Sequence, residues 1–397
     1  MEISKARIRA FFRSGWERQG RRTRRILKRL PVVFLILGVG LCIFSVIRIV
    51  QVTQSQKSQI AAELWAGDSG NTYRQISCFA VGQTQADGGP DKVLSSDRSL
   101  GIQDILTIRK SLDTIVKESS GMDTGKGNDS NTPEVEITNK LWIDAYSADA
   151  KCTVERKATE LQAEAFSEVM LTGVSGDYYL FHPLQMVDGA FLSDDTLDSK
   201  KIVLDKELAF KLFRTYNVVG SKVSINGRSY TIVGVVRHAD NKIDRKAYGD
   251  YLRAYVFFDE LAYLSAPDPE KEVSAEPDSS NLAIMCYEVV LPNKLRNIAL
   301  QNLITSMEAA GKTEKNFLFV DNTNRFSLLR LYDTVFPIGE NTDHRMLFKL
   351  PFWEVSAQTA ESILVFWWIL ECTGIILILT SIPGIYLSRK KERYTRI

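Results

Sequence analysis

Two long apolar stretches lie near opposite ends of the chain, at residues 30–47 and 362–387. A stretch of 18 or more apolar residues is long enough to cross the hydrocarbon core of a bilayer as a helix. The first stretch exceeds the apolar part of a signal peptide, and no small-residue cleavage pattern follows it closely. The pattern therefore predicts two transmembrane helices, at 30–50 and 361–387.

Basic residues flank both stretches on the sides that face the chain ends. The first 30 residues carry eleven Lys and Arg and two acidic residues, and five Lys and Arg against one Glu follow Leu387. Cytoplasmic flanks of membrane spans are enriched in Lys and Arg. We therefore expect a plasma-membrane protein with both termini cytoplasmic, as a basic segment 1–29 and a basic tail 388–397. Residues 51–360 then form an extracytoplasmic domain.

Helical and strand-like patterns alternate within residues 51–360. Residues 100–118 carry apolar positions at helical spacing, and 202–204 form a short apolar strand before a helix that begins at Asp205. The mixture predicts the α+β class. We expect a two-lobed mixed α/β domain between two transmembrane helices, in which the segments near both ends form one lobe. A β-rich lobe at about 150–260 is inserted between them.

Asn226 and Gly227 separate two runs of alternating apolar residues, 223–225 and 230–236. An Asn-Gly pair in this setting is a strong signal for a hairpin with a type I′ turn, in which both turn residues have positive φ. The pattern predicts a β-hairpin with Asn226 and Gly227 as its turn.

The stretch between the apolar runs carries a net negative charge, which argues against nucleic-acid binding. Three of the five cysteines, Cys78, Cys152 and Cys286, lie in this outer stretch, where disulfides can persist. One alternative is a Cys78–Cys152 disulfide, because both residues fall in strand-like segments. The other is three buried free thiols, which the small number of cysteines in a large domain favours.

The sequence carries no catalytic or metal-binding motif. Its three histidines, His182, His238 and His344, are far apart, which favours structural or surface positions. Residues 121–127 resemble a phosphate-binding loop superficially, but the spacing is one residue short and Gly127 replaces the Ser or Thr that would hold Mg²⁺. We therefore expect a protein that is not an enzyme and that needs no cofactor and no metal.

Glu371 is an ionisable residue inside the second predicted span. Such residues are costly in a bilayer and are paired or functional by default. Arg48 lies at the outer end of the first span, at a similar depth, so a Glu371–Arg48 pair is one interpretation. The alternative is that the Glu371 side chain reaches toward water at the interface.

Four segments of residues 177–237 resemble one known family. They read FHPL at 181–184, DGAF at 188–191, KIVLDKELAFKLF at 201–213, and VGSKVSINGRSYTIVGVV at 219–236. This succession is similar to the MacB-like periplasmic core domain of MacB/FtsX-type ABC transporter permeases. The resemblance implies a two-lobed outer domain inserted between the first and second spans. It also implies an oligomeric membrane unit and a cytoplasmic ATPase.

Family permeases continue with two further spans after the second, whereas this sequence ends ten residues after Leu387. It therefore resembles a permease shortened at the C-terminus. We expect further permease chains and a separate ABC ATPase to be partners, in a homo- or hetero-oligomer in the lipid bilayer. The expected function is that of a membrane subunit of an ABC-type export or mechanotransmission system, whose outer domain transmits motion or binds cargo. The alternative is a membrane-anchored extracytoplasmic binding or sensing module without transport.

Overall fold

The computed structural model describes residues 2–81, 98–119, 140–158, 163–193, 198–238, 241–248, 251–264, 282–295, 297–335, 348 and 350–394. The chain divides into two compact units. One unit holds residues 1–54 and 360–397 and is made of apolar helices. The other holds residues 55–359 and is the mixed α/β domain.

The apolar unit is built from α1 (Glu2–Ser55) and α11 (Phe352–Tyr394), whose segments Arg29–Ser55 and Phe352–Tyr386 are long and apolar enough to cross a membrane. Small residues bring the two helices together. A Cβ atom placed on Gly38 would lie 2.8 Å from the backbone oxygen of Gly374, and one placed on Gly384 would lie 2.8 Å from Pro31. These pairs run in opposite directions along the sequence, so the helices pack antiparallel, as small interface residues allow in membranes.

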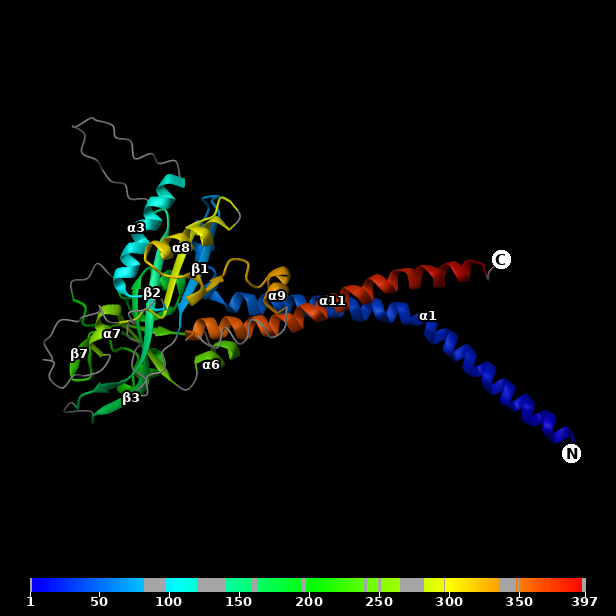
Figure 1. Ribbon diagram of the computed structural model, residues 1–397. Coiled ribbons are helices and arrows are strands. Elements are labelled where there is room, and N and C mark those ends of the chain that lie inside the picture. The colour runs from blue at the N-terminus through cyan, green and yellow to red at the C-terminus, as the bar shows by residue number, and fades with distance from the viewer. Residues whose placement is uncertain are drawn as a thin grey trace. The chain divides into compact units, whose positions relative to one another are not determined.

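One mixed sheet forms the centre of the domain (Figure 1). Among the described residues it has ten strands: β1 (Tyr73–Ala80), β2 (Ile143–Arg156), β3 (Ala165–Gly176), β4 (Gln185–Gly189), β5 (Lys201–Asp205), β6 (Lys222–Ile225), β7 (Arg228–Arg237), β8 (Leu252–Phe257), β9 (Cys286–Pro292) and β10 (Phe317–Asp321). Their order is β10-β1-β9-β2-β3-β8-β5-β7-β4, and β6 pairs with β2 and β7. The pairs β3–β8 and β5–β7 are parallel and the others are antiparallel.

Short helices cover both faces of this sheet. They are α2 (Ala61–Ala66), α3 (Ile102–Ser119), α4 (Tyr178–Phe181), α5 (Lys206–Phe213), α6 (Lys242–Tyr248), α7 (Phe258–Leu264), α8 (Ile298–Ala309) and α9 (Leu328–Val335), with 3₁₀ turns at Lys57–Gln59 and Glu314–Asn316. Helices α3, α5, α7 and α8 pack on one face, and α2, α4 and the start of α11 pack on the other. Helix α3 buries Ile105, Ile108, Leu112 and Val116, the positions that its apolar spacing predicts.

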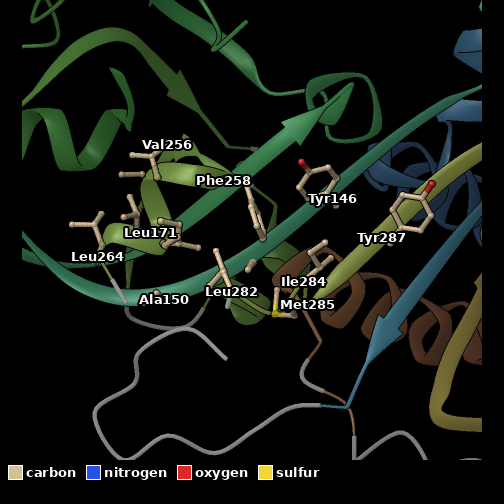
Figure 2. Close-up of a cluster of buried hydrophobic side chains, with 14 of the residues drawn as sticks. Tyr146, Ala150, Leu171, Val256, Phe258, Leu264, Leu282, Ile284, Met285 and Tyr287 are labelled. Atoms are coloured by element: carbon tan, nitrogen blue, oxygen red, sulfur yellow. The ribbon is translucent and has the colours of Figure 1, made fainter. Parts of the chain in front are cut away.

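The larger core joins the two parts of the sequence that build the domain (Figure 2). Tyr146 of β2 meets Phe258 of α7 edge to face, with ring centroids 5.0 Å apart, and Tyr287 of β9 belongs to the same cluster. Strands β1, β9 and β10, from the flanking sequence, occupy one end of the sheet. Strands β3 to β8, from the middle of the sequence, occupy the other end. The predicted mixed α/β class is confirmed, and its two parts share one sheet.

Strands β6 and β7 form an antiparallel hairpin in which Ile225 pairs with Arg228. Asn226 and Gly227 are the two turn residues, with φ of 49° and 80°. Positive φ at both positions is the geometry of a type I′ turn, and Asn and Gly are the residues that adopt it most readily.

The structure does not form the alternative Cys78–Cys152 disulfide: both residues are free thiols. Strand β9 separates β1 from β2, and Cys78 is in register with Tyr287, which is in register with Tyr146. Cys152 lies six residues farther along β2, roughly 20 Å away at strand geometry. A disulfide needs Cα atoms within about 7 Å, so the strand order excludes the bridge.

Candidate functional site

The first turns of α11 enter the α/β domain and are held there by buried side chains. Residues 352–359 belong to the domain unit, and Trp353, Glu354 and Ser356 are buried. Each of these three side chains contacts a different element of the domain. We use the name helix anchor for the contacts of these three side chains together with those of Phe352, the first residue of α11.

Glu354 forms a bidentate ion pair with Arg325, which lies between β10 and α9. The Arg325 nitrogens Nη1 and Nη2 donate to Glu354 Oε2 and Oε1 at 2.6 and 2.7 Å. Arg325 Nη1 also donates to Asn322 Oδ1 at 3.0 Å. Removing one partner of such a buried pair leaves an uncompensated charge in the interior, so the pair strongly disfavours separation of α11 from the domain.

The polar contacts continue from Asn322 to strands β1 and β9 of the sheet. Asn322 Nδ2 donates to Ser77 Oγ on β1 at 2.8 Å, and Ser77 Oγ donates to Glu288 Oε1 on β9 at 2.7 Å. The other oxygen of Glu288 lies 2.5 Å from His182 Nε2, directly after α4. The His182 ring packs on Trp353, with centroids 4.0 Å apart. The contacts that start at Glu354 therefore return to α11 at Trp353, the preceding residue.

Phe352, the first residue of α11, packs against the guanidinium group of a buried arginine. The guanidinium of Arg253 on β8 lies 4.2 Å from the centroid of the Phe352 ring, and its Nη1 lies 3.6 Å from Asp149 Oδ2 on β2. His238 at the end of β7 also contacts Phe352 edge-on, and its Nε2 lies 2.6 Å from Tyr255 Oη. The anchor therefore reaches strands of the middle part of the sequence as well.

Ser356 joins the start of α11 to the end of α1. Gln56, which directly follows α1, donates from Nε2 to Ser356 Oγ at 3.2 Å. Ser356 in turn donates to Asp244 on α6. Burial raises the pKa of the Asp244 carboxyl, while the hydrogen bonds from Ser356 and Asn241 act in the opposite direction. The two chain segments that connect the domain to the apolar helices therefore share one polar contact.

A small hollow lies within the anchor. It encloses ≈ 460 Å³, part of it open solvent, and is lined mostly by polar side chains, among them Gln56, His182, His238, Asp244 and Ser356. No group of three or more His, Cys, Asp or Glu side chains is placed to hold a metal ion among the residues described. The arrangement is suited to holding a helix in one orientation through several directional contacts at once.

The family model of the MacB-like periplasmic core domain matches residues 32–284, which is more than half of the chain. The chain belongs to the MacB-like periplasmic core domain family. This confirms the resemblance in the sequence, and such domains are parts of ABC-type transporter permeases. The two apolar helices that flank the domain agree with a membrane-bound protein of this family.

Two solved structures are similar to this MacB-like chain. The first is the periplasmic region of MacB from Actinobacillus actinomycetemcomitans, at 15% sequence identity and a TM-score of 0.36; the match covers 63% of this chain and 89% of the MacB chain. The second is the extracellular domain of the noncanonic ABC-type transporter YknZ from Gram-positive bacteria, at 16% identity and a TM-score of 0.36; the match covers 62% of this chain and 99% of the YknZ chain. A comparison with curated proteins found no match.

Glu371 lies inside the packed helix pair of this MacB-like protein, but its partner differs from the one the sequence suggested. It accepts a hydrogen bond from Ser45 on α1. Arg48 instead donates to Gln51 at 2.9 Å, and its guanidinium lies 5.4 Å from the centroid of the Trp367 ring. Glu371 therefore lies level with Ser45, about one helical turn away from Arg48.

Sequence reasoning did not find the anchor. Histidines 182 and 238 were expected in structural or surface positions, and the structure brings both to the hollow beside α11. His344 and the 121–127 loop lie outside the described residues. Two features did carry a signal: the aromatic pair Phe352–Trp353 and the acidic Glu354 stand directly before the second apolar stretch. The partner of Glu354, Arg325, has no local signature.

Proposed function

We propose that this MacB-like chain is a membrane subunit of an ABC-type export or mechanotransmission system, and that its outer domain receives motion through the start of α11. The observation that supports this proposal is the helix anchor. Four side chains in the first turns of a span-forming helix are held by five separate elements of the domain. A displacement of this helix start therefore acts on the whole sheet.

The polar character of the anchor favours transmission over simple attachment. Apolar contacts are non-directional and allow sliding, whereas a bidentate Arg–carboxylate pair holds one geometry. The Arg325–Glu354 pair continues through Asn322 and Ser77 to Glu288, on adjacent strands β1 and β9. A shift of Glu354 therefore changes hydrogen bonds on strands β1 and β9 of the sheet.

The proposal includes a topology and partners. Both termini lie in the cytoplasm, because basic residues flank both spans on their outer sides in sequence. A separate ABC ATPase then makes its contacts with 1–29, with 388–397 or with a further permease chain. Maleimide labelling of intact cells checks the orientation: single cysteines at 119–132 should react and those at 10–20 should not, and the reverse result excludes this topology.

Co-purification tests the partnership. Tagged protein extracted from native membranes in mild detergent should bring down an ABC ATPase and a permease chain. Deleting 388–397 should reduce the recovered ATPase several-fold, whereas the charge-conserving variant Arg389→Lys should not. Recovery of neither partner would favour the alternative, an anchored binding or sensing module without transport.

Hydrogen exchange tests transmission in the purified complex. Addition of a non-hydrolysable ATP analogue should change exchange in 352–359 and in β1 and β9. In Glu354→Gln, which removes the charge at nearly constant size, the change in β1 and β9 should disappear. Glu260→Gln removes an equally buried carboxylate elsewhere in the domain and should leave the response intact. An intact response in Glu354→Gln would contradict transmission through the anchor.

A further inference from the structure

Helix α9 exposes three apolar side chains within five residues of one another. Leu329 is 79% exposed, Tyr332 is 62% exposed and Leu328 is 42% exposed, while Leu331 is 2% exposed and packs on the domain. All four residues lie within the eight residues of α9. A helix with one face packed on its own domain and an exposed face of Leu and Tyr is amphipathic in the manner of helices that lie on membranes.

The contacts at the start of α9 fix its place in the domain. Arg325, three residues before α9, is the partner of Glu354 in the first turn of α11. Arg330 within α9 donates to Asp321 at the end of β10 at 2.8 Å. Helix α9 therefore begins three residues after a side chain that is bound to the first turn of α11.

We propose that α9 lies in the headgroup region of the outer leaflet, with Leu328, Leu329 and Tyr332 turned toward the acyl chains. Arg325 ties the start of α9 to Glu354, which stands eight residues before the apolar stretch that begins at residue 362. Tyr is enriched at that boundary because its ring is apolar and its hydroxyl is polar. This inference depends on the proposal that α11 crosses the membrane. It does not depend on the proposal that the helix anchor transmits motion to the domain.

The size of the patch favours lipid over protein as its occupant. A stable protein–protein interface buries about 800 Å² on each partner. An eight-residue helix is about 12 Å long, and three exposed side chains supply only a fraction of that area. Lipid contact has no such threshold, because each apolar side chain that leaves water contributes separately.

Depth-dependent quenching of a fluorescent amino acid tests the proposal on the full-length chain in phosphatidylcholine nanodiscs. The probe is placed at position 329 and, as a matched control, at position 166, because Phe166 is 71% exposed and lies in β3 of the middle part. Brominated lipids should reduce the emission at 329 at least twofold, and aqueous iodide should have little effect. The probe at 166 should show the opposite pattern.

Two outcomes overturn the proposal. Equal iodide quenching at 329 and 166 would place α9 in water, and protection of position 329 from both quenchers would show that protein covers the patch. A substitution gives a second measurement: with the probe at 332, Leu329→Asp should lower bromolipid quenching by at least half, whereas Phe166→Asp should not change it. Unchanged quenching in Leu329→Asp also contradicts the proposal.

Discussion

The domain contains two buried Arg–Glu pairs with nearly the same chemistry and different surroundings. Arg228 on β7 lies 3.1 Å from Glu260 on α7, and Tyr230 and Ser199 complete the hydrogen bonds of this carboxylate at 3.0 and 2.5 Å. All of these residues lie within residues 199–260. The Arg325–Glu354 pair instead continues through further residues to strands β1 and β9. The first pair ties local elements together, whereas the second joins a membrane helix to the domain.

The largest expected effect is the loss of either arginine. Arg325→Ala and Arg228→Ala each leave a buried glutamate without its charge partner, which costs about 3–5 kcal/mol. Denaturation of the full-length protein in detergent, followed by tryptophan fluorescence, should show similar losses. Hydrogen exchange should separate them: only Arg325→Ala should raise exchange in 352–359. If both variants raised hydrogen exchange in 352–359 equally, the two Arg–Glu pairs would not differ in the way proposed.

A smaller effect is expected at the hairpin of the middle part. Gly227 has φ of 80°, and a Cβ atom there would meet open space, so the cost of a substitution comes from the backbone alone. Gly227→Val should destabilise the domain by about 1 kcal/mol or more, because a β-branched residue resists positive φ. Gly227→Asn, which tolerates that region better, is the control. An unchanged melting temperature in Gly227→Val contradicts the type I′ turn, and neither variant should alter exchange in 352–359.

The anchor should also give the domain a modest pH dependence through Asp244. Burial raises the folded-state pKa of this carboxyl above 3.8, so the folded protein holds the proton more tightly than the unfolded chain. That contribution to stability is present below pH 3.8 and is lost as pH rises through the folded pKa. The melting temperature should therefore fall as pH rises through this range in wild type and in the exposed control Asp68→Asn. The fall should be smaller in Asp244→Asn. An equal fall in Asp244→Asn would show that other groups cause it.

The smallest effect concerns the thiols. Burial raises the pKa of Cys152 to about 12, which leaves almost no thiolate at pH 8, and Cys78 and Cys152 are too far apart to bridge. A reductant should therefore leave the melting temperature unchanged. Maleimide should react with Cys152 only after unfolding, while Phe166→Cys, at an exposed site, should react at once. A loss of stability on reduction would show that a disulfide forms.

Local signals in the sequence predicted the elements whose geometry depends on neighbouring residues. The Asn226–Gly227 turn and the apolar stripe of α3 both have short-range causes: positive φ and helical spacing. The helix after Asp205 is also present, but Asp205 makes no side-chain capping hydrogen bond to it. The anchor depends on pairings that no local pattern encodes. Glu288 meets His182 across 106 residues, and this contact exists only because β9 lies beside β1 and β2.

The pair suggested for Glu371 illustrates the same limit inside the membrane. The sequence did not give the register of the two packed helices. Arg48 lies against Trp367, and Glu371, four residues farther along α11, lies against Ser45. Because residues three apart lie on the same face of a helix, Arg48 differs from Ser45 mainly in depth along the helix.

The strand order has a consequence for the way the domain is made. Strand β1 emerges early in synthesis, yet its neighbours β9 and β10 begin more than 200 residues later. Strands β2 to β8 come from residues 143–257 and can pair among themselves as soon as they appear. We expect the middle part to become protease-resistant first, in a released fragment that ends near residue 264, before β1 can pair with β9 and β10. A delay of this kind follows from loop closure, because distant pairings form slowly.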